Sequence, residues 1–151
     1  MAPDQKHEWQ TLTAEEKLRE AEAAAREAVS LLEITGPQSL LADALIRHGI
    51  TLARLGETER AEVDLERAMI VAVQLGTLDK AGLAALTMIE ELEGLSAEAL
   101  ITNYKRASTW LADFPSIELL LRVNDAARKV LVRLKGKLDP DEALDILLRK
   151  N

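Results

Sequence analysis

The sequence predicts an all-α fold in which about seven antiparallel helices stack as helical hairpins. Three observations lead to this prediction. Glycine and proline separate long stretches of helix-forming residues, the apolar residues between these breaks recur at helical spacing, and small and apolar positions return after about 40 residues. Because the turns between the stretches are short, neighbouring helices are expected to run antiparallel.

The first half of the chain contains signals for four helices. Thr13 is placed to cap the first helix, which should end before Gly36-Pro37. Ser39 is expected to cap the second helix, and Gly76 to end the third. The predicted spans are Ala14 to Ile34, Leu40 to Arg54, Thr58 to Gln74 and Leu78 to Leu92.

The second half contains signals for three more helices. Ser96 and Ser116 are expected to cap the fifth and sixth helices, with Phe114-Pro115 ending the fifth. The predicted spans are Ala97 to Ala112, Ile117 to Lys135 and Pro140 to Lys150. The apolar stripe expected to face the core on the sixth helix is Ile117, Leu120, Leu121, Ala127, Val130, Leu131 and Leu134.

Short turns are compatible with a closed bundle or with an open stack of hairpins, and an internal repeat favours the stack. The aligned positions are Ala21, Ala25 and Ala28, then Ala61, Leu65 and Ala68, then Leu100, Tyr104 and Ala107. A recurrence of this length is typical of stacked helical pairs, because one pair cannot bury its apolar face alone.

The segment 42–69 resembles a tetratricopeptide repeat at Leu45, His48, Gly49, Leu52, Leu55, Gly56, Ala61, Leu65 and Ala68. Small residues at Gly49, Ala61 and Ala68 would let two helices approach closely. The chain departs from the family pattern at His48, which replaces the usual leucine, and at Val73, where a proline often closes the repeat. The resemblance implies an α-solenoid that binds a protein or peptide segment on its concave face without catalysing a reaction.

A second resemblance gives an alternative function. The strings AGLAALTMIEEL, YKRA and LRVNDAARKVL are similar to helical-repeat regions of bacterial multidomain transcription regulators. This resemblance implies a sensory or oligomerisation segment, and we identify no DNA-reading helix after Leu134.

Composition narrows the classes of function. The chain has 151 residues, a net charge of -7, no cysteine and only four aromatic residues, so disulfide frameworks and base-stacking surfaces are not expected. The acidic balance argues against nucleic acid as a partner, and the absence of a long apolar run argues against a membrane span. We expect a cytoplasmic protein with a flexible polar leader at 1–12 and one helical-repeat domain at 13–151.

No motif in the sequence indicates an enzyme, a metal site or a cofactor. His48 is expected to be a core histidine with a local hydrogen bond. Glu90 and Glu91 are adjacent on a helix and point about 100 degrees apart, so they are expected to lie at a solvated helix end rather than to share a substrate. A third, less favoured, alternative is an all-helical enzyme or a small-molecule pocket.

The expected binding groove follows the first helix of each pair, which lines the inner wall of a solenoid. Its candidate partner-binding residues are Asp43, Ile46, Arg47, Ile50, Arg54, Asp79, Leu83, Leu86 and Glu90. An alternative interpretation is that Asp43 and Arg47 are merely a charge pair on the surface of one helix. The basic cluster Arg122, Arg128, Lys129, Arg133, Lys135 and Lys137 is interpreted as a solvated face. The alternatives are that it binds the acidic surface of a partner or the acidic half of a second copy or, least favoured, nucleic acid. An open stack has exposed ends, and the alanine-rich face from Ala21 to Ala28 of the first helix would allow self-association, for example as a homodimer. An equal alternative is that the first helix folds back as a cap on the stack.

Overall fold

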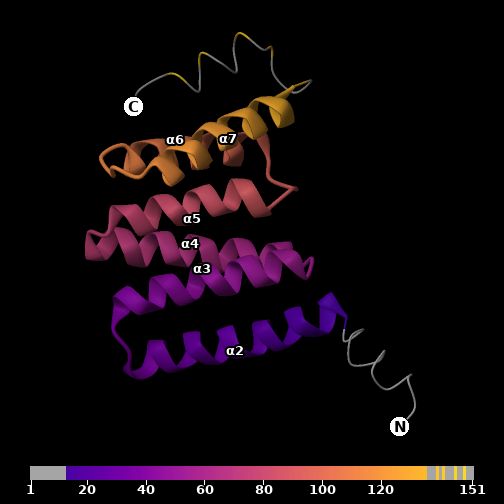
Figure 1. Ribbon diagram of the computed structural model, residues 1–151, viewed down its shortest axis with the longest axis vertical. Helices are drawn as coiled ribbons and strands as arrows, with labels where there is room; N and C mark the ends of the chain where they lie inside the picture. Colours follow the sequence, from indigo (N-terminus) through magenta and orange to yellow (C-terminus); the bar gives the residue numbers. More distant parts are fainter. Residues whose placement is uncertain (1–12, 136–138, 140, 142–144, 146–147, 149–151) are drawn as a thin grey trace.

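The computed structural model describes residues 13–135 together with 139, 141, 145 and 148, and its described part forms six helices (Figure 1). They are α2 (Ala14–Thr35), α3 (Gln38–Arg54), α4 (Thr58–Leu75), α5 (Leu78–Glu91), α6 (Ala97–Leu111) and α7 (Ile117–Leu134). The prediction of an all-α chain is confirmed for these residues. The expected leader at 1–12 and most of the expected helix Pro140 to Lys150 lie outside them.

Three of the four expected serine and threonine caps are present. The hydroxyl oxygens of Thr13, Ser96 and Ser116 accept hydrogen bonds from backbone N–H groups three residues later, at 3.2, 3.1 and 3.2 Å. The prediction for Ser39 is wrong, because α3 begins at Gln38, two residues before the expected first residue, Leu40. Pro37 occupies the cap position there without a side-chain cap, and its fixed φ suits the start of a helix.

The closest helix contacts are made where the sequence has glycine. A Cβ added to Gly49 of α3 would lie 2.8 Å from Cγ of Leu65 on α4, which is closer than van der Waals contact. Ala61 and Ala68 of α4 are fully buried. A second close contact, absent from our sequence analysis, joins Gly82 of α5 to Leu111 of α6, where an added Cβ would lie 2.6 Å from Cγ.

The helices follow one another along the long axis of the molecule, with α2 at one end and α7 near the other (Figure 1). Each helix packs against the next one in the chain, and α5 also contacts both α3 and α7. Within the described residues, arginine and lysine also form ion pairs between helices. Each of these pairs joins one helix to the second helix after it in the chain. These pairs are Glu33–Arg67, Asp43–Lys80, Arg54–Glu91, Glu66–Arg106 and Glu90–Arg122.

The expected core stripe of α7 is partly wrong. Ile117, Leu120 and Leu121 are 78%, 61% and 57% exposed. The buried residues of this helix are instead Ala126, Val130 and Leu134, with Leu119 and Val123 packed partly buried against the core. The helix is apolar on two sides, so the spacing of its apolar residues did not determine which side would face α5 and α6.

Candidate functional site

The nine predicted partner-binding residues are divided between the surface and the core. Ile46 and Leu86 are 5% and 0% exposed and belong to the main core cluster, so the expectation that they offer surface to a partner is wrong. Ile50 and Leu83 pack partly buried against the same cluster. Helices α3 and α5 contact each other, and these apolar residues pack into the core instead of facing an open inner wall.

The charged members of the predicted set are mostly paired with neighbouring helices. Arg54 donates two hydrogen bonds to Glu91, at 3.0 and 3.4 Å, which raise the pKa of its guanidinium above the ordinary value. Glu90 accepts two from Arg122, at 2.6 and 3.1 Å, and this hydrogen bonding raises the pKa of Arg122. These groups hold α5 between α3 and α7, which leaves them less available to a ligand.

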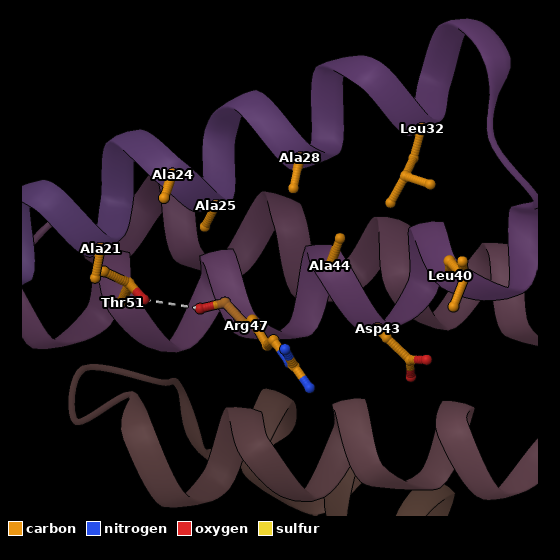
Figure 2. A pocket seen from close by; sticks show the side chains of 10 residues that line it. All are labelled: Ala21, Ala24, Ala25, Ala28, Leu32, Leu40, Asp43, Ala44, Arg47 and Thr51. Atoms are coloured by element: carbon orange, nitrogen blue, oxygen red, sulfur yellow. Dashed lines mark hydrogen bonds between the residues drawn. The ribbon is translucent and has the colours of Figure 1, made fainter.

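A groove of about 640 Å³ lies between α2 and α3 and contains two of the predicted residues, Asp43 and Arg47. Its walls are mostly apolar and small (Figure 2). The lining residues are Ala21, Ala24, Ala25, Ala28 and Leu32 of α2, and Leu40, Asp43, Ala44, Arg47 and Thr51 of α3. Figure 2 shows the alanines of α2 pointing toward α3, whereas Asp43 and Arg47 point away from α2 at the edge of the groove.

The polar groups at the edge of the groove differ in whether they are already bonded. Asp43 accepts a hydrogen bond of 3.0 Å from Lys80 of α5, and the Thr51 hydroxyl donates to the backbone carbonyl of Arg47 at 2.9 Å. The Arg47 guanidinium is exposed and makes no hydrogen bond or ion pair within the described chain. It is therefore a cation with its donors directed to solvent beside an apolar groove.

Small side chains on α2 leave the groove open. Ala21, Ala24, Ala25 and Ala28 line it, and each has only a methyl group to extend toward α3. In the repeat alignment Ala25 corresponds to Leu65 of α4, but Leu65 is buried against the helix that precedes it in the chain, so the two residues lie at different kinds of interface. The alanine-rich face of the first helix is the signal in the sequence for this groove.

His48 is buried as expected, but its contacts are between helices rather than local. Its Nε2 lies 3.3 Å from a carboxylate oxygen of Glu22 on α2, and its Nδ1 contacts the carboxylate of Asp64 on α4. Glu22 and His48 are only 8% and 5% exposed. Because each ring nitrogen faces a carboxylate oxygen on a different helix, the imidazole joins three helices through buried polar contacts. His48 therefore helps to connect α2 to α3 and α4.

The basic cluster of the C-terminal part does not form one continuous cationic face. Arg122 is bound to Glu90, and Arg133 donates to the backbone carbonyls of Ile89 and Leu92, at 3.1 and 2.9 Å. Arg133 thereby satisfies carbonyls at the C-terminal end of α5. Arg128 pairs with Asp125 at 3.8 Å, and Lys137 lies outside the described residues.

Within the described residues, no group of three or more histidine, aspartate or glutamate side chains is arranged to hold a metal ion. No described helix combines the length and apolar character needed to cross a membrane. Comparisons with protein-family models, curated sequences and solved structures gave no match to the chain.

Proposed function

We propose that the chain is a non-catalytic helical-repeat scaffold that binds a peptide segment of a partner protein in the groove between α2 and α3. The bound segment would place small or medium apolar side chains against the alanine wall and a carboxylate beside Arg47. The observation that carries this proposal is the combination of an apolar groove of about 640 Å³ with an exposed guanidinium that has no partner in the described chain.

The walls of the groove favour a peptide over a small polar molecule. The alanines at successive turns of α2 face α3 across an elongated channel rather than an enclosed cavity. Such a channel can accept a row of apolar side chains from an extended or helical segment, as in other helix-lined recognition grooves. Its single free cation would then set the direction in which the segment binds.

The packing of the helices supports a tetratricopeptide-like α-solenoid as the architecture. Helices two apart in the chain are joined by ion pairs, and α5 contacts both α3 and α7. This is the pattern expected when successive hairpins stack so that all first helices lie on one side and all second helices on the other. Under this proposal the groove is the interval between the second helix of one pair, α2, and the first helix of the next, α3.

The proposal is tested by selection from a phage-displayed library of random peptides, followed by titration of the enriched peptides with calorimetry. We expect enriched sequences to combine aspartate or glutamate with leucine, isoleucine or methionine. Arg47→Glu should weaken binding about tenfold or more, since a hydrogen bond to a charged group is lost and repulsion is added. Ala25→Leu should weaken it as well, because the leucine fills the groove.

Matched variants separate these effects from general changes in charge or helix stability. Arg19→Glu makes the same charge change on α2 at a residue that does not line the groove. Ala23→Leu makes the same size change two residues from Ala25, on the exposed side of α2. Both controls should bind as the wild type does. Failure to enrich any peptide, or binding that survives both Arg47→Glu and Ala25→Leu, would contradict the proposal.

A further inference from the structure

The outward face of α7 is an exposed apolar surface that the peptide groove does not use. Ile117, Leu121, Asn124 and Arg128 recur at helical spacing along this face, and Val132 continues it at 70% exposure. Ile117 and Leu121 are 78% and 57% exposed. Isolated apolar residues on a surface are ordinary, but several on one face of one helix indicate an interaction site.

The order of residues along this face makes it complementary to itself. Ile117 lies seven residues before Asn124, and Val132 lies seven residues after Asp125. A second copy of α7 running antiparallel, centred between Asn124 and Asp125, therefore places Val132 of the second copy opposite Ile117. The same two-fold axis places Arg128 of the second copy opposite Leu121, which its aliphatic stem can cover.

Charge also favours the antiparallel arrangement. In a parallel pair, Arg128 would face Arg128 of the second copy, which is a repulsive contact. In the antiparallel pair, Arg128 is offset from Asp125 of the second copy by four residues, or about 6 Å along the helix axis. Within one chain, Arg128 and Asp125 form a long ion pair of 3.8 Å, and their side chains are 82% and 67% exposed. Both therefore have room to form a second contact across the interface.

We propose that α7 is the interface of a two-fold symmetric homodimer in which the two copies of this helix pack antiparallel. An isologous contact of this kind closes on itself and does not extend into a filament. The interface is one helix wide, so we expect a buried area at the lower end of the range for stable dimers, about 1,200 Å², and dissociation at micromolar concentration.

The absence of cysteine from the chain allows a direct test with the full-length protein. In Asn124→Cys the two introduced thiols lie beside the proposed two-fold axis, so mild oxidation should convert most of the protein to a disulfide-linked dimer. Ala23→Cys, on the exposed side of α2, should remain largely monomeric under the same conditions. Equal cross-linking of the two variants would contradict the assignment to α7.

Sedimentation velocity over a range of concentrations tests the interface without a cross-link. The mass should rise from 16.6 kDa to twice that value and then stop. Leu121→Glu should abolish the dimer with the helical circular dichroism unchanged. Ile34→Glu, at a residue of the same size on α2 that is 79% exposed, should leave the dimer intact. A monomer at all concentrations, a mass that grows beyond the dimer, or a dimer unaffected by Leu121→Glu would overturn the proposal.

A charge exchange tests the predicted register of the two helices. Arg128→Asp should weaken the dimer several-fold, because it places two aspartates near each other across the interface. Adding Asp125→Arg exchanges the two charges and should restore most of the affinity. If the double variant associates no better than the single one, the antiparallel register is wrong.

Discussion

Gly49→Ala is the sharpest test of the packing between α3 and α4. In an ordinary helix interior this change stabilises by about 1 kcal/mol, because alanine has the higher helix propensity. Here the added methyl group would lie 2.8 Å from Cγ and 3.0 Å from Cδ2 of Leu65, and 3.4 Å from the carbonyl oxygen of Ala61. Leu65 is fully buried, so it can move only by disturbing its other neighbours.

The two effects oppose each other, and the steric one should win. Overpacking a dense core costs about 1 to 3 kcal/mol, so we expect Gly49→Ala to destabilise the protein by about 1 kcal/mol after the propensity gain. The measurement is urea denaturation followed by circular dichroism. For a chain of this length the corresponding loss in melting temperature is about 3 °C.

Two further variants make this prediction specific. Gly94→Ala is the control: an added Cβ meets no atom within 4 Å, and we expect a change of no more than about 0.5 kcal/mol. The second is Leu65→Ala, which alone should cost about 2 to 5 kcal/mol. Combined with Gly49→Ala it should cost less than the sum, because the new methyl group enters the space that Leu65 vacated. A stabilising Gly49→Ala would refute the close contact.

Three other substitutions test individual polar contacts by the same denaturation assay. His48→Leu should destabilise by about 3 kcal/mol, because the carboxylates of Glu22 and Asp64 lose their shared partner; no loss would mean that these contacts contribute little. Asn103→Leu should stabilise by about 1 kcal/mol, since its buried Oδ1 has no hydrogen-bond partner among the described residues; a destabilised variant would show that the amide is needed. Arg133→Met should cost about 1 to 2 kcal/mol by freeing the carbonyls of Ile89 and Leu92 at the end of α5, and an unchanged stability would argue against this capping role.

Local signals in the sequence were sufficient for the helices and most of their ends. Capping depends on a hydroxyl and the next three residues, so Thr13, Ser96 and Ser116 could be assigned without knowledge of the fold. Ser39 was misassigned because Pro37 competes for the same helix start and is compatible with an uncapped first turn. The close approach at Gly49 was also predictable, since only a small residue fits where two helices touch.

The site was harder to predict because exposure depends on which neighbours a helix acquires. Ile46 and Leu86 were placed on the groove from the expected inner wall, yet α3 and α5 contact each other along that side and bury them. Likewise, Arg54 was expected to be available to a partner, but Glu91, 37 residues later, takes up its guanidinium. These outcomes follow from contacts between helices distant in sequence, which helical spacing alone does not encode.

Ala25→Leu connects the stability of the stack to its proposed binding function. Because Ala25 lines the groove with only a methyl group, a leucine at this position should bury added apolar surface between α2 and α3. Each fully buried methylene stabilises by about 0.8 kcal/mol, and the groove is open on one side, so we expect a gain of about 1 kcal/mol rather than the full value for three carbons. Ala23→Leu should give no comparable gain, because that side of α2 is exposed. An Ala25→Leu variant that is more stable and no longer binds peptide would show that the open groove lowers the stability of the stack. A destabilised Ala25→Leu would instead mean that the space beside α3 is already too narrow to accept a ligand side chain.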